Sequence, residues 1–61
     1  MPIITAKIVA GRTPEQKKAF MQALARAAMD SISAPEHSIR VVLEEVPPEN
    51  WGVGLKTKAE M

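Results

Sequence analysis

A chain of 61 residues is long enough for one small domain, residues 1–61, and too short to bury a large core. It has no cysteine to form a disulfide, and its histidine and carboxylates show no metal-ligand spacing. Because disulfides and metals are the usual additional supports of so small a domain, self-association is the one that remains, and we expect a homo-oligomer. The net charge of +1 gives no reason to expect a nucleic-acid partner, and the lack of a signal sequence or a membrane-spanning apolar run predicts a cytoplasmic protein with no membrane partner.

The first predicted element is a strand over Pro2 to Val9, "PIITAKIV", because its side chains alternate between two faces. One face carries Ile4, Ala6 and Ile8, and the other carries Ile3, Thr5, Lys7 and Val9. Pro2 has two interpretations. If Met1 is retained, Pro2 is a strand-start residue whose missing N–H costs the sheet nothing. If Met1 is removed, Pro2 is a free secondary amine that can act as a base or a nucleophile.

A helix is predicted over Pro14 to Ile32. Thr13 can cap it, Pro14 suits its first position, and Gln16 completes a capping box. Apolar residues recur at helical spacing, with Met21 and Met29 widening an arc made by Phe20, Ala23, Leu24, Ala27, Ala28 and Ile32. So wide an arc suggests that the helix packs on its own sheet and also on a partner subunit.

A second strand is predicted over Ser38 to Val46, "SIRVVLEEV". Two strands joined by a helix form a right-handed βαβ unit with parallel strands, and the fold class is α+β. Arg40 would lie in the middle of this strand, on the face opposite to Ile39, Val41 and Leu43. A lone arginine in a strand buried on both faces needs a carboxylate or a ligand, and Glu44 is its possible structural partner.

The remainder, "PPENWGVGL" followed by "KTKAEM", predicts a loop that leads into a short extended or hairpin piece and then a polar, frayed end. His37 lies in a polar turn and is predicted to be solvated rather than catalytic. Two more candidates have an ordinary alternative each. Arg12 could be a solvated turn residue, and Trp51 could be an aromatic anchor at a subunit interface.

Taken in order, "PII" after Met1, "GRTPEQK", "SIRVVLEEV" and "NWGVG" resemble the 4-oxalocrotonate tautomerase family, and the resemblance extends to about Gly54. It implies a βαβ protomer with a C-terminal hairpin, paired into dimers with a four-stranded sheet and assembled as a homohexamer, a trimer of dimers. It also implies no metal, no cofactor and a site built from more than one subunit. Leu55 stands where the family often has a further glycine.

The resemblance also assigns roles in a tautomerase acting on a small 2-keto or dienol carboxylic acid. Pro2 is the general acid and base, Arg12 and Arg40 bind the carboxylate and carbonyl oxygens of the substrate, and Trp51 takes the place of the active-site aromatic. We expect Arg40 to lower the barrier by stabilising the developing enolate, which makes it catalytic with Pro2, and Arg12 to contribute binding.

Pro2 needs a lowered pKa for this work, since a secondary amine is ordinarily protonated at neutrality. The sequence offers two causes and does not rank them. One is repulsion by Arg12 or Arg40, and the other is an apolar wall made by Ile3, Val9, Val46 and Trp51.

Two rival functions stay open. Related proline-dependent dehalogenases and hydratases have a carboxylate two residues beyond the loop aromatic, where this chain has Val53, which argues against dehalogenation but leaves decarboxylation open. If Met1 is retained, a non-enzymatic oligomeric binding module becomes the better interpretation.

Overall fold

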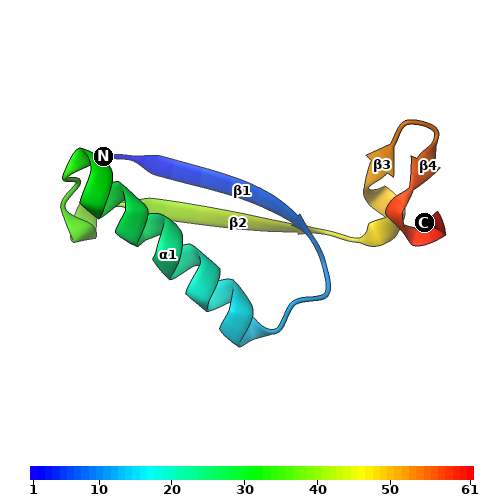
Figure 1. The fold of residues 1–61 in the computed structure, drawn as a ribbon, viewed down its shortest axis with the longest axis horizontal. Coiled ribbons are helices and arrows are strands. Elements are labelled where there is room, and N and C mark those ends of the chain that lie inside the picture. The colour runs from blue at the N-terminus through cyan, green and yellow to red at the C-terminus, as the bar shows by residue number, and fades with distance from the viewer.

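The computed structural model describes residues 1–61 and has the predicted βαβ arrangement followed by a hairpin (Figure 1). The elements are β1 (Ile3–Val9), α1 (Pro14–Ile32), β2 (Arg40–Val46), β3 (Gly52–Val53) and β4 (Lys56–Thr57), with 3-10 turns at Glu36–Ser38, Pro48–Asn50 and Lys58–Glu60. No helix in the structure is both long enough and apolar enough to span a membrane.

The predicted limits of α1 are confirmed, and so are the interactions at its start. The Gln16 N–H donates to the Thr13 hydroxyl at 3.1 Å, and the Thr13 N–H donates to the Gln16 side-chain oxygen at 3.0 Å. This capping box satisfies two backbone groups that a helix start leaves without partners. The helix ends at Ser33, whose φ of 58° cannot continue it.

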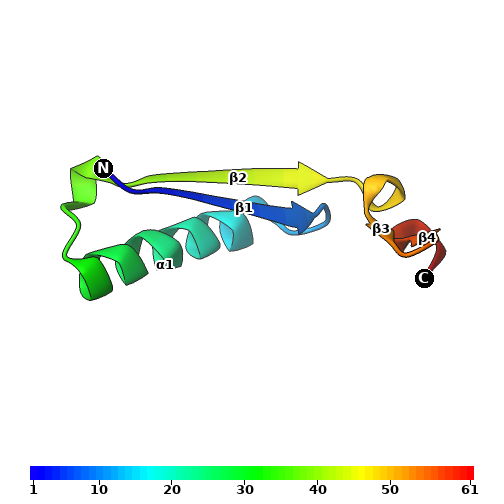
Figure 2. The same ribbon diagram turned by 90° about the horizontal axis from the view of Figure 1, so that it is seen from above.

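β1 and β2 pair in parallel from Ile3 opposite Arg40 to Val9 opposite Val46. The helix covers one face of this sheet and leaves the other face open (Figure 2). The Lys17 ammonium reaches from the helix to the Glu45 carboxylate at 2.7 Å. The predicted start of the second strand at Ser38 is wrong by two residues, because Glu36–Ser38 forms a 3-10 turn first.

The predicted frayed C-terminus is also wrong. β3 and β4 form an antiparallel hairpin, and a 3-10 turn follows it. The Glu60 carboxylate accepts hydrogen bonds from the Thr57 N–H at 3.0 Å and the Thr57 hydroxyl at 3.1 Å. The Lys58 N–H donates to the Trp51 carbonyl at 2.9 Å, which fastens the turn to the start of the hairpin.

One copy of the chain has almost no interior, since Ala28 alone is buried. The radius of gyration is 14.4 Å, whereas a compact chain of this length has about 10.5 Å. The exposed area is 4639 Å², whereas roughly 3,900 Å² is usual for this mass. Large apolar side chains stay exposed on the open sheet face, as at Ile3 (67%), and on the helix, as at Phe20 (40%). These side chains are not covered within one copy of the chain.

Candidate active site

The four predicted site residues divide into two groups at opposite ends of the β1 and β2 sheet. Pro2 and Arg40 lie where the two parallel strands begin, whereas Arg12 and Trp51 follow the points where these strands end. Seven residue pairs separate the two ends, which is roughly 20 Å at about 3.3 Å per residue. One copy of the chain therefore does not bring all four side chains to one small substrate.

At the first end, the backbones of Pro2 and Arg40 are in contact. The Arg40 N–H donates to the Pro2 carbonyl at 3.0 Å. The guanidinium turns back along its own chain and donates to the carbonyls of His37 at 2.9 Å and Ile39 at 3.3 Å. Met1 precedes Pro2 and is 81% exposed in one copy of the chain.

Two expectations for Arg40 are corrected by this arrangement. Arg40 is the first residue of β2 and is exposed, rather than lying mid-strand between two covered faces. Glu44 is not its partner, because the single ion pair of the structure joins Lys17 to Glu45. The charge of Arg40 is thus satisfied only by two backbone carbonyls and stays available to an anion.

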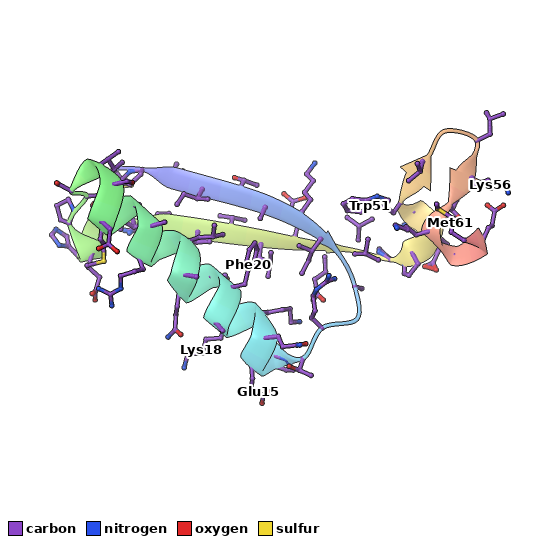
Figure 3. The ribbon with its side chains drawn as sticks, in the orientation of Figure 1. Glu15, Lys18, Phe20, Trp51, Lys56 and Met61 are labelled. Carbon is purple, nitrogen blue, oxygen red and sulfur yellow. The ribbon has the colours of Figure 1, made fainter.

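At the second end, Arg12 and Trp51 line one hollow of about 480 Å³, together with Ile8, Val9, Pro48 and Lys58. The Arg12 guanidinium is steadied by a hydrogen bond to the Val9 carbonyl at 2.9 Å and has no carboxylate partner. Trp51 is half-buried between the end of the sheet and the hairpin (Figure 3). Two of the predicted site residues, Arg12 and Trp51, thus line the same hollow.

Lys58 also lines this hollow and is not among the site residues predicted from the sequence. It stands in the segment that was predicted to be frayed, where nothing in the hydrophobic pattern marks it. The available signal was the hairpin itself, because a tight turn between Gly52 and Thr57 returns position 58 to the side of position 51.

The predicted apolar wall around Pro2 is not present within one copy. Val9, Val46 and Trp51 lie at the Arg12 end, and Ile3, which adjoins Pro2, is 67% exposed. Desolvation of the Pro2 amine would need side chains of another subunit. His37 is exposed, as predicted.

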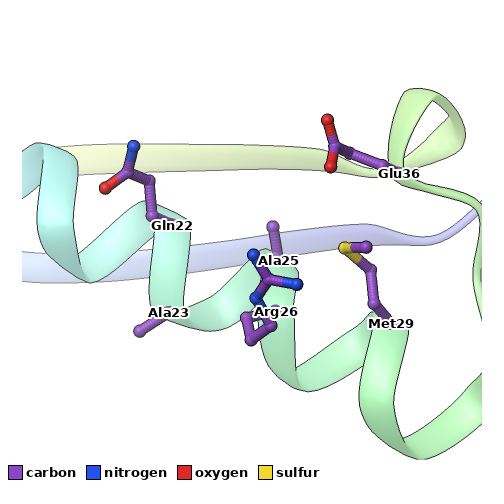
Figure 4. A pocket seen from close by; sticks show the side chains of 6 residues that line it. All are labelled: Gln22, Ala23, Ala25, Arg26, Met29 and Glu36. Carbon is purple, nitrogen blue, oxygen red and sulfur yellow. The ribbon is translucent and has the colours of Figure 1, made fainter.

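Two other hollows occur in the structure. One of about 230 Å³ shares Ile8 and Arg12 with the Trp51 hollow and extends it toward the start of α1. The larger one, about 600 Å³, lies beside α1 and the following turn and contains none of the four predicted residues; its lining is Gln22, Ala23, Ala25, Arg26, Met29 and Glu36 (Figure 4). No group of three or more histidine, cysteine, aspartate or glutamate side chains is placed to hold a metal ion.

Comparison with known proteins identifies the family to which the chain belongs. The family model described as "Tautomerase enzyme" matches residues 2–61. A probable tautomerase of Ralstonia nicotianae is 43% identical over 87% of this chain and 76% of its own. The 2-hydroxymuconate tautomerase of Comamonas testosteroni is 40% identical over 95% of this chain and 94% of its own. A solved heterohexamer 4-oxalocrotonate tautomerase from Chloroflexus aurantiacus J-10-fl is 34% identical, with a TM-score of 0.93 over 100% of this chain and 98% of that one.

Proposed function

Since the chain belongs to the 4-oxalocrotonate tautomerase family of the tautomerase superfamily and is an isomerase of that kind, we propose that it moves a proton between the enol oxygen and a carbon of a small 2-keto or dienol carboxylic acid. The named activity of the Comamonas relative makes 2-hydroxymuconate-like dienols the first substrates to consider. The observation that carries the proposal is the pair of arginines without carboxylate partners, one beside Pro2 and one beside Trp51.

In the proposed mechanism, Met1 has been removed and the Pro2 nitrogen is a secondary amine. The nitrogen accepts the proton of the enol hydroxyl, the electron pair moves through the conjugated chain, and the protonated nitrogen returns the proton to a carbon. The net reaction is an isomerisation and uses no cofactor. Arg40 stabilises the negative charge on the oxygen, Arg12 binds a carboxylate, and Trp51 packs against the conjugated chain.

We further propose that each site combines Pro2 and Arg40 of one subunit with Arg12 and Trp51 of another. Support comes from the separation of the two groups by roughly 20 Å within one copy. The exposed apolar faces and the two open sheet edges suit pairing with further copies of this chain. We expect a homohexamer built as a trimer of dimers, in line with the hexameric state of the Chloroflexus relative.

The proposal is tested by intact-mass measurement and by following the ketonisation of 2-hydroxymuconate and phenylenolpyruvate by ultraviolet absorbance. The mass should show that Met1 is absent. Pro2→Ala and Arg40→Ala should each lower kcat by about a hundredfold or more, the usual range for the loss of a general base or an oxyanion donor. Equal rates for the wild type and both variants, with Met1 absent, would exclude the mechanism. A retained Met1 together with an inactive wild type would favour the binding module.

A further inference from the structure

We infer that Lys58 is a specificity-determining residue, a second cation beside Arg12 that selects substrates with a carboxylate at the end remote from the reacting carbonyl. The inference rests on the proposed function for the position of the reacting end, which is at Pro2 and Arg40. The hollow at the other end of the sheet contains Arg12, Trp51 and Lys58. It would receive the remote end of a substrate held between two subunits.

The backbone of Lys58 is held in place. Its N–H donates to the Trp51 carbonyl at 2.9 Å, and it is the first residue of the 3-10 turn Lys58–Glu60. The turn is capped through Thr57 and Glu60. The start of the Lys58 side chain is therefore held close to the tryptophan by the backbone.

The charge of the hollow is unbalanced. Two cations line it, and its other four residues are apolar. Neither Arg12 nor Lys58 forms an ion pair, because Lys17 and Glu45 make the single salt bridge of the structure. Glu60, the acid nearest in sequence, is engaged by the backbone and hydroxyl of Thr57. The hollow thus presents uncompensated positive charge against an apolar wall, where an anion interacts more strongly than in open water.

This chemistry fits a carboxylate at the end of an unsaturated chain. The planar chain would lie against the indole of Trp51, and the terminal carboxylate would accept hydrogen bonds from the Arg12 fork and the Lys58 ammonium. A monocarboxylate of the same length, with its carboxylate at the reacting end, would bring no anion to either Arg12 or Lys58. Lys58 should therefore change the choice between these two classes and leave the chemical step unaffected.

Binding can be measured without turnover, because Trp51 is the single tryptophan of the chain and lines the hollow. We would titrate muconate, an unreactive six-carbon dicarboxylate, and sorbate, the monocarboxylate of the same chain length, and follow Trp51 fluorescence. The variants are Lys58→Met, which removes the charge, and Lys58→Arg, which keeps it. Lys56→Met is the matched control, because Lys56 lies two residues away in β4 and does not line the hollow. In Figure 3, Lys56 and Trp51 lie on opposite sides of the hairpin.

Lys58→Met should weaken muconate binding by about threefold to tenfold, the range of a partly exposed charge-assisted contact. Sorbate binding should change by less than about twofold, and the muconate effect should shrink as salt is added. Lys58→Arg and Lys56→Met should each bind muconate with about the affinity of the wild type. Equal effects of Lys58→Met and Lys56→Met, or an equal loss for both ligands, would overturn the inference.

Turnover separates this inference from the proposed function. With 2-hydroxymuconate, Lys58→Met should raise KM and leave kcat within about twofold, since it removes binding common to ground and transition states. With phenylenolpyruvate, neither constant should change by more than about twofold. A wild type that prefers muconate through Lys58 but turns over neither enol would contradict the proposed function and support the role of Lys58. Turnover that depends on Pro2 but is unaffected by Lys58→Met would support the proposed function and contradict the role of Lys58.

Discussion

At the scale of single residues, the proposed chemistry depends on how Pro2 stays unprotonated. Two causes were available from the sequence, an apolar wall and a neighbouring cation. Within one copy the wall is missing, because Ile3 is exposed and the other apolar residues lie at the far end of the sheet. Arg40 is the nearer of the two arginines, because its backbone N–H donates to the Pro2 carbonyl, while its guanidinium donates to the carbonyls of His37 and Ile39. We expect repulsion by Arg40 to contribute to a lower pKa of the Pro2 amine, beside the apolar side chains that another subunit brings to it.

This expectation gives a pH dependence with a definite sign. kcat/KM should rise as the pH increases through the pKa of the free Pro2 amine, because the unprotonated form is the base. Arg40→Gln removes a positive neighbour and makes the protonated amine more favourable, so this pKa should rise and the rising limb should move to higher pH. Arg26→Gln, with the same charge change on the helix, is the control. If the rising limb of the pH profile of Arg40→Gln lies at the same pH as that of the wild type, the lowered pKa is due to burial by another subunit and not to Arg40.

At the scale of elements, local signals explain which parts of the fold were predictable. The limits of α1 follow from Thr13, Pro14 and Gln16, which act on adjacent backbone groups and need no tertiary information. The alternation in β1 likewise predicts which side chains share a face, and the predicted set Ile4, Ala6 and Ile8 is the less exposed one. The fold class was predicted from these elements, because a strand, a helix and a strand in so short a chain have few other arrangements.

The same signals failed where the structure depends on contacts between segments. Ser38 and Ile39 continue the alternation of the second strand, yet the hydrogen bond from the Ser38 hydroxyl to the Pro35 carbonyl at 2.8 Å belongs to a turn. The C-terminal turn has no apolar pattern, and its order comes from Thr57, Glu60 and the bond to Trp51. Lys58 was missed for that reason.

The open face of the sheet leads to a prediction about assembly. Val42 lies opposite Thr5 on the face away from α1 and is 47% exposed. If this face packs against other copies, Val42→Glu buries a charge without a partner there. The variant should dissociate into smaller species in sedimentation velocity, and its activity should fall by more than about tenfold at the same concentration.

Ala19→Glu is the control for this variant, because it adds the same charge to an exposed position of α1. It should keep the mass and the activity of the wild type. A Val42→Glu protein with an unchanged sedimentation coefficient and full activity would show that the open face is not a subunit contact.

At the scale of the whole molecule, the main result is that the four proposed site residues lie in two groups at opposite ends of the sheet. Parallel strands begin at one end and finish at the other, so the βαβ topology by itself places Pro2 and Arg40 far from Arg12 and Trp51. The candidate residues and the parallel sheet were each predictable from the sequence. The distance between the two groups of residues follows only when the two predictions are combined. The contacts between copies depend on which surfaces pair, and the sequence of one chain does not specify this. Assembly is therefore the part of the account that needs experiment first.

The most direct test of a site shared between subunits is complementation. Pro2→Ala and Arg12→Ala should each be poorly active alone, since every site lacks one group. Coexpression in equal amounts forms mixed oligomers, in which about a quarter of the sites combine an intact Pro2 from one subunit with an intact Arg12 from its neighbour. The account predicts that the mixture regains about a quarter of the wild-type specific activity. No recovery in oligomers shown by mass to contain both variants would contradict it.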